Sequence, residues 1–273
     1  MIGALKYYHR HRNLLYNFVV RDLRGKYAGS SFGLLWAVVQ PLVFLVVYTV
    51  VFSIILNISM KPNVPGFSHL DSALLIFCGM VPWLAFAEGF QRATTSITDN
   101  ANLIKKVAFP AAILPAHIVI SSMLNMVIGM AIIIAAVLIL KGSISAALFF
   151  LPVILLLQFI FTIGLALFFS SMHVFFRDTA HVVNMLVMLW MFCTPIFYPA
   201  ERIYDSAALP AAFKIIYSAN PTALMLTAYR NIFYDGVIPQ WYITGVFALA
   251  AAIAFAVGYL AFSRTQRRFA DMV

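Results

Sequence analysis

Residues 33–57 read GLLWAVVQPLVFLVVYTVVFSIILN, a run of 25 residues without a charged side chain. An α-helix rises 1.5 Å per residue, so about 20 residues cross the ~30 Å hydrocarbon core of a bilayer. Backbone that is not helical at that depth leaves its amides without hydrogen-bond partners. The run therefore predicts a transmembrane helix.

Five further apolar stretches of similar length follow, at 72–94, 111–140, 146–171, 180–198 and 239–262. The composition agrees with this pattern, because 63% of the residues are hydrophobic, 10% are charged and the mean hydropathy is +0.95. We therefore expect an all-α, multi-pass integral membrane protein, with six transmembrane helices in a single domain over residues 1–273.

The basic residues divide unequally between the two sides that six spans define. If the N-terminus is cytoplasmic, 13 of the 18 Lys and Arg residues lie on the cytoplasmic side, and the other five are Lys61, Lys141, Arg202, Lys214 and Arg230. Lys and Arg resist translocation, so both termini are expected in the cytoplasm. This placement explains the net charge of +9, and no nucleic-acid partner is expected.

Residues 1–30 are expected to form an amphipathic helix in the plane of the membrane interface. Arg21, Arg24 and Lys26 stand at its end, just before the first span. Two interpretations remain open. These cations anchor the helix to anionic membrane lipids, or they also meet the anionic headgroup of a lipid-linked substrate where it enters the protein.

The link from this helix to the first span contains Gly25, Gly29 and Gly33 at intervals of four residues. In lipid such spacing lets two helix backbones approach closely. Here the glycines straddle a polar turn, which favours a bend between an interfacial and a spanning helix.

The first span carries an aromatic ladder with residues four apart: Trp36, Gln40, Phe44, Tyr48 and Phe52. A four-residue step on a 3.6-residue helix drifts by about 40°, so these side chains form a slowly winding stripe. Sugar C–H faces stack on aromatic rings, and a row of rings with few hydrogen bonds suits a conduit along which a glycan slides. The alternative is an ordinary helix-packing face.

Glu88 and Arg92 lie at i, i+4 near the end of the second span. An internal ion pair explains them most simply. A proton-relay carboxylate is the alternative, but the spans contain no second acidic residue. An ion-coupled carrier is therefore disfavoured.

Residues 96–109 are too polar to span a membrane and are patterned for a short cytoplasmic helix. The loop HVFFRDTAH, residues 173–181, also faces the cytoplasm. Both are connectors, or they are surfaces on which a cytoplasmic motor acts. The chain has no motor of its own, because its one Gly-Lys pair, Gly25-Lys26, lacks the surrounding residues of a GxxxxGK[ST] phosphate-binding loop.

Residues 205–235 are too apolar for an exposed loop, and prolines interrupt them. Within them, residues 221–234 predict a short helix with Asn220 as N-cap and Gly236 beyond its end. Such a helix is too short to span, so a re-entrant helix pair dipping from the outer face is expected. A pair of flat interfacial helices is the alternative.

Three stretches carry a resemblance to a known family. They are RDLRGKYAGSSFGLLWAVVQPLVFLVVYTVVF (21–52), FFRDTAHVVNMLVMLWMFCTPIFYP (175–199) and NPTALMLTAYRNIFYDG (220–236). They resemble the type 2 ABC exporter permeases for polysaccharides, particularly those for O-antigen and teichoic acid. The resemblance implies a homodimer with two copies of a cytoplasmic ABC ATPase. It also implies export of a polyprenyl-diphosphate-linked polysaccharide across the bacterial cytoplasmic (inner) membrane.

The resemblance also implies roles for residues. The first and fifth spans would line the conduit, which adds Met188, Phe192 and Tyr198 to the aromatic ladder. The coupling helix would cover about 98–108, with Asp99, Asn102, Leu103, Lys105 and Lys106 meeting the ATPase. The outer gate would place Tyr229 and Arg230 near its polar mouth.

No catalytic residue, cofactor or metal site is expected on this chain, and ATP and Mg would be used by the partner subunit. Two other classes of function remain. A type 2 ABC exporter of a drug or small lipid could share the fold. An ion-coupled carrier or a membrane-embedded glycan-processing enzyme would work without an ATPase partner.

Overall fold

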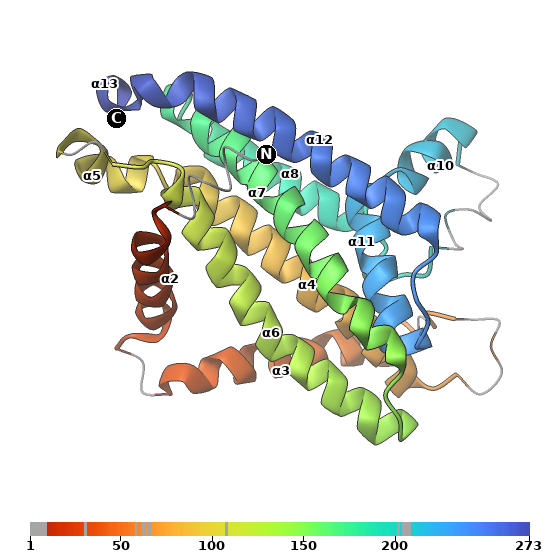
Figure 1. The fold of residues 1–273 in the computed structure, drawn as a ribbon. Helices are drawn as coiled ribbons and strands as arrows, with labels where there is room; N and C mark the ends of the chain where they lie inside the picture. The colour runs from red at the N-terminus through yellow and green to blue at the C-terminus, as the bar shows by residue number, and fades with distance from the viewer. Residues whose placement is uncertain are drawn as a thin grey trace.

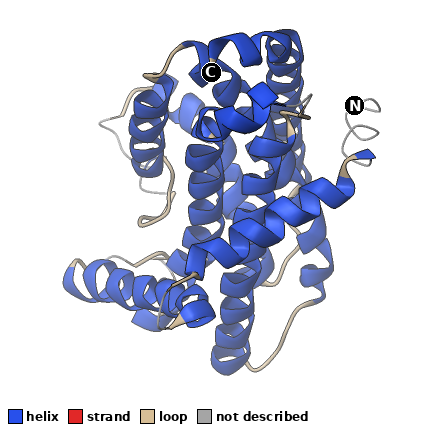
Figure 2. Cartoon of the chain, turned by 90° about the vertical axis from the view of Figure 1, so that its left-hand side faces the viewer, coloured by secondary structure: helices blue, strands red, loops and turns tan. Residues whose placement is uncertain are grey.

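The computed structural model describes residues 10–29, 32–57, 59–61, 64, 67–106, 109–200, 203 and 209–273. The described residues form helices joined by turns and short loops, with no strand among them (Figure 2). The all-α prediction is confirmed. Residues 1–9 of the predicted interfacial helix and most of 201–208, before and within the predicted re-entrant pair, lie outside the described residues.

Within the described part of the chain, four helical segments are long and apolar enough to cross a membrane. Their main helices are α4 (His69–Thr95), α6 (Ile113–Lys141), α7 (Leu151–Phe175, preceded by η4, Ala146–Phe150) and α12 (Trp241–Thr265). They run side by side through the molecule (Figure 1). These segments coincide with four of the six predicted spans.

The other two predicted spans contain shorter helices. In the first, η1 (Gly33–Leu35), α3 (Trp36–Tyr48) and the wider turns of η2 (Thr49–Ile55) follow one another without a break. In the fifth, α8 (Thr179–Phe192) ends before the predicted limit at Tyr198. Pro195 has no N–H to continue the helical hydrogen bonds, so the chain leaves α8 in a series of turns.

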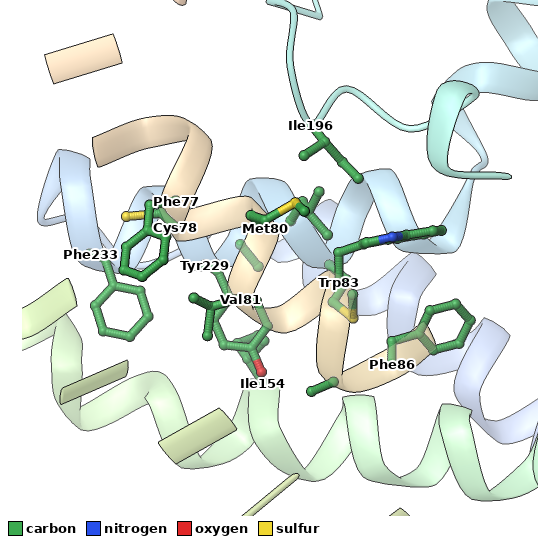
Figure 3. Close-up of a cluster of buried hydrophobic side chains, with 14 of the residues drawn as sticks. Phe77, Cys78, Met80, Val81, Trp83, Phe86, Ile154, Ile196, Tyr229 and Phe233 are labelled. Carbon is green, nitrogen blue, oxygen red and sulfur yellow. The ribbon is translucent and has the colours of Figure 1, made fainter. Parts of the chain in front are cut away.

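Helix α4 lies at the centre of the molecule. It packs against α3, η2, α6, α7, α8 and α11 (Pro221–Arg230), and most of its side chains are buried. Figure 3 shows Phe77, Met80, Trp83 and Phe86 of α4 in a cluster with residues of other segments, among them Ile154 of α7. Neighbouring segments surround α4 more completely than they surround α6, α7 or α12.

Helices α7 and α12 touch backbone to backbone. A Cβ atom added to Gly258 would overlap the carbonyl oxygen of Gly164, and one added to Gly164 would overlap the backbone at Ala254 and Phe255. In lipid, where apolar surface gains little from leaving the solvent, small residues that allow such approach hold helices together.

The two ends of the bundle carry different short elements (Figure 1). One end carries η3 (Thr98–Asn100) with α5 (Ala101–Lys106), and η6 (Gln266–Arg268) with α13 (Phe269–Met272); α5 and α13 are in contact. Toward the other end lie α10 (Ala211–Ser218), α11 and η5 (Asn231–Asp235). The predicted cap is present, because Asn220 Oδ1 accepts from the Thr222 N–H at 3.1 Å.

Helix α2 (Arg12–Tyr27) lies on the outside of the bundle against α6. Between α2 and α3, Gly29 and Gly33, the first residue of η1, have φ angles of +79° and +50°. A Cβ atom at either position would meet nothing within 4 Å, so neither glycine serves a close helix contact within the chain. The glycine spacing therefore produces a bend.

The contact between α7 and α12 gives a test of the packing. Gly258→Ala should force the two helices apart and destabilise the protein by about 1–3 kcal/mol, the usual effect of overpacking. Gly245→Ala on the same helix α12 is the matched control, because its added Cβ would meet nothing within 4 Å. Thermal unfolding in detergent should separate the two variants; equal melting temperatures would contradict the close contact.

Candidate functional site

Three rings of the aromatic ladder form a continuous row along α3 and η2. The ring centroids of Phe44 and Tyr48 are 6.0 Å apart, as are those of Tyr48 and Phe52. Gln40 and Phe44 line a cavity of about 90 Å³ that α4 and α6 close from the other side. Trp36, at the start of α3, is exposed. The four-residue spacing therefore brings most of the ladder together.

The structure brings one further ring to the ladder, and it was not predicted from the sequence. Phe197, in the turns after α8, stacks on both Tyr48 and Phe52. The predicted lining residues Met188 and Phe192 instead lie on the exposed face of α8. The hydroxyl of Tyr198 donates to the carbonyl of Phe192 at 2.8 Å and so folds back onto the end of α8.

The predicted headgroup residues lie beside a second, larger cavity. It has a volume of about 470 Å³ and lies between α2, the end of α4, η3 and the start of α6. Arg21 and Lys26 line it, together with Arg92 and the buried His117. Arg24 is not among the lining residues. Asp22 and Asp99 line it as well, so the wall carries both positive and negative charges, and two of the three predicted residues belong to it.

An ion network joins α2 to α4 at the edge of this cavity. Arg92 bonds to Asp22 of α2 at 2.5 Å and to Glu88 of its own helix at 2.9 Å, which confirms the predicted Glu88–Arg92 pair. Lys26 completes the network through Glu88, also at 2.5 Å. Two cations and two carboxylates thus neutralise one another in a partly buried place, as charges near a membrane require.

Short helical elements, η3 and α5, lie within the predicted coupling region, and their coupling role stays a prediction. Asn102, Leu103 and Lys105 are exposed, whereas Ile104 turns inward into a cluster that includes the fully buried Phe269 of the C-terminal segment. The carboxylate of Asp99 accepts from the Thr95 hydroxyl at 2.7 Å and so stays close to the end of α4. The side chain of Lys106 and residues 107–108 lie outside the described part of the chain.

Tyr229 and Arg230, predicted near the mouth of the outer gate, lie in the interior of the chain. Tyr229 is fully buried, and its hydroxyl donates to Gln158 Oε1 at 2.6 Å. Gln158 in turn donates to the carbonyl of Pro82 in α4 at 3.0 Å. The Arg230 guanidinium donates to carbonyls of α4 and of the segment after α8. Their role in gating stays a prediction.

Residues 13–234 match the family described as ABC-2 type transporter. This chain belongs to the ABC-2 type transporter family.

Several relatives align with almost the whole chain. Two proteins of Klebsiella pneumoniae called O-antigen export system permease protein RfbA are 31% and 29% identical over 263 and 262 residues, each covering 96% of this chain and 95% of the relative. A protein of the same description from Myxococcus xanthus is 29% identical over 240 residues, or 88% of this chain and 87% of the relative.

Membership of the ABC-2 family accounts for the apolar helices of the chain. Permeases of this family are the membrane-embedded components of ABC transporters and leave nucleotide binding to an ATPase partner. The apolar helices agree with a multi-pass membrane transport protein. The family match covers the ladder, the ion network, the coupling helix and Arg230, so each of these lies within the ABC-2 region.

Two contacts that matter for the site were not predicted. Asp22 lies 70 residues from Arg92 in sequence, and Phe197 lies far from Tyr48 and Phe52. Asp22 carried a weak signal, because it stands at i, i−4 from Lys26 on the amphipathic helix. Phe197 lies in the stretch TPIFYP, which prolines interrupt. Helical spacing therefore cannot indicate which way its side chain points.

The ion network predicts how firmly α2 is attached. Arg92→Gln should raise amide hydrogen exchange in α2 about fivefold, equivalent to roughly 1 kcal/mol, because Asp22 loses its cationic partner. Asp22→Asn should have the same effect, and the double variant should add little to either. Arg24→Gln, on the same helix but outside the network, is the control. Unchanged exchange in Arg92→Gln would show that the network does not hold α2.

Proposed function

We propose that this chain is the transmembrane subunit of an ATP-driven exporter that moves a polyprenyl-diphosphate-linked polysaccharide, such as O-antigen, across the bacterial cytoplasmic membrane. The observation that carries the proposal is the near full-length match to permeases named for O-antigen export. The continuous row of aromatic rings supports it, because such a surface offers a polymer repeated weak contacts along the direction of travel.

The proposed topology has six spans with both termini in the cytoplasm. Segment 33–57 and α8 with the turns after it provide the first and fifth spans. The end that carries α5 and α13 then faces the cytoplasm, and α10 and α11 form the re-entrant pair on the outer side. The positive-inside distribution of Lys and Arg supports this orientation.

Two copies of this chain and two copies of a cytoplasmic ATPase would make the exporter. Many large apolar side chains of α3 and α8 are exposed, including Val43 and Val46 of α3 and Met185 and Met188 of α8. Lipid or a second copy of the chain would cover them. The ATPase would contact α5 through Asn102, Leu103 and Lys105, and α5 is a continuation of α4 through η3.

In this mechanism, closure of the ATPase subunits on ATP and Mg pushes the cytoplasmic helices and widens the seam between the permease copies. The lipid diphosphate passes α2, where Arg21 lines the larger cavity and Lys26 lies beside it in its pair with Glu88, and the sugar chain follows along the ladder. Arg is suited to diphosphate recognition because its planar fork donates two parallel hydrogen bonds.

Depletion of the protein in its native host tests the proposal. Surface labelling should show loss of the polysaccharide, while extraction of the cell interior should show accumulation of its lipid-linked form. Restoring the chain from a plasmid is the control. An unchanged amount of surface polysaccharide would remove this substrate and leave a drug or small lipid as the cargo.

The ladder has its own test. The triple variant Trp36→Ala/Tyr48→Ala/Phe52→Ala should reduce export while the protein still assembles, because the sugar chain loses its stacking surfaces. The matched control is Val39→Ala/Val43→Ala/Val47→Ala, which trims three exposed residues of the same helix that are also four apart but face another direction. Normal export from the aromatic variant would reduce the ladder to a packing face.

A further inference from the structure

The turns between α8 and α10 hold Phe197 against the aromatic ladder. Phe197 belongs to the segment that ends the predicted fifth span. It is 7% exposed, and its ring packs against the predicted first span. Its centroid is 4.4 Å from that of Phe52 with an interplanar angle of 7°, and 4.9 Å from that of Tyr48 with an angle of 29°. These are closer and flatter contacts than those between successive rings of the ladder. Aromatic pairs at such distances attract one another beyond the area they bury.

Arg230 of α11 fixes the backbone on which Phe197 stands. Its Nη1 donates to the Pro195 carbonyl at 2.6 Å and its Nη2 to the Ile196 carbonyl at 2.8 Å. Its Nε donates to the Leu75 carbonyl of α4 at 3.1 Å. One guanidinium therefore ties the residues just before Phe197 to the central helix. Figure 3 shows Ile196 beside the α4 side chains at this place.

The other end of α11 holds the same segment. Asn220 donates to the Cys193 carbonyl at 3.1 Å and accepts from the indole N–H of Trp190 at 2.9 Å. The hydroxyls of Thr194 and Thr222 are 2.8 Å apart. Irregular backbone at membrane depth is stable only where its polar groups have partners, and α11 supplies them at both ends. The position of Phe197 is therefore set by α11 and α4 together.

A sugar ring that stacks on Tyr48 or Phe52 needs a free aromatic face, and Phe197 covers a face of each. We propose that Phe197 is an occluding residue that closes the conduit at Tyr48 and Phe52 by the kind of stacking that a sugar would use, and that Arg230 is the positioning residue that holds it there.

Opening then means that the segment 193–198 withdraws and the rings of Tyr48 and Phe52 become available to the sugar chain. Because Arg230 bonds both to Leu75 of α4 and to the residues just before Phe197, a displacement of α4 is transmitted to Phe197 through its guanidinium. This inference rests on the proposed function for the direction of the conduit and the nature of the cargo. It adds that the stacking of Phe197 on Tyr48 and Phe52 closes the path and that Arg230 sets the position of Phe197.

A leak assay tests the occlusion without any polysaccharide. The complex isolated from the native host through a tag on this chain is placed in liposomes loaded with radiolabelled sucrose, and efflux is followed without ATP. Phe197→Ala should raise efflux at least several-fold over the wild type. Phe233→Ala is the matched control, because Phe233 is equally buried in the same core but stacks on Tyr229 instead of the ladder.

Arg230→Gln and Arg230→Lys test the positioning role. Neither side chain presents the planar fork that reaches Pro195, Ile196 and Leu75 at once, so both variants should also leak. Phe197→Tyr keeps the stacking ring and should stay as tight as the wild type. Wild-type tightness in both Phe197→Ala and the Arg230 variants, or an equal leak from Phe233→Ala, would overturn the proposal and make Phe197 an ordinary core residue.

Export measured in parallel separates this inference from the proposed function. If Phe197→Ala leaks sucrose but the wild-type complex moves no lipid-linked polysaccharide, the occluding contact stands and the cargo is wrong. If the wild type exports the polysaccharide and Phe197→Ala neither leaks nor changes export, the cargo stands and the occluding role is overturned.

Discussion

The burial of α4 on all sides is the constraint on which the rest of the structure depends. With 27 residues, α4 is about 40 Å long, enough to cross a bilayer. Small residues of α4 and α6 let the two helices come close. A Cβ on Gly129 of α6 would lie 2.7 Å from Val81 of α4, and one on Gly89 of α4 would lie 2.6 Å from the Ser122 hydroxyl of α6. Every other span either packs on α4 or packs on a helix that does.

Each end of α4 is fastened by charged or polar side chains. At its start, Ser68 is the N-cap and forms a capping box with Asp71. Asp71 also accepts from the Tyr234 hydroxyl at 2.9 Å, while Lys141 lies over the Tyr234 ring. At its end, Arg92 bonds to Asp22 of α2. A turn and η3 lead from this end of α4 to α5. The end of α4 that holds α2 is thus also the end that leads to α5, and its residues line the larger cavity.

The sequence predicts those features that depend on spacing along one segment. The positions of the long spans, the Asn220 cap, the Glu88–Arg92 pair and the row of rings in the ladder follow from hydropathy, capping preference and helical period. Spacing along one segment cannot predict which residues of other segments pack against its face. Asp22 and Phe197 meet residues far away in the sequence, and the inward direction of Tyr229 depends on Gln158 of a different helix. The early end of α8 follows from Pro195. An average of hydropathy over residues 180–198 does not detect the effect of that proline.

Arg230 shows why a cation in an apolar stretch needs its partners identified before it is given a role. The family resemblance implies that Arg230 lies near the polar mouth of an outer gate. In the structure three of its N–H groups point to backbone carbonyls, two of which lie where α8 has been interrupted. Interrupting a helix in a buried place creates carbonyl acceptors that water cannot reach, and a buried guanidinium satisfies several of them at once. The same interruption frees the backbone to turn Phe197 toward the ladder, so the buried cation and the stacked rings are two consequences of one break in helical structure.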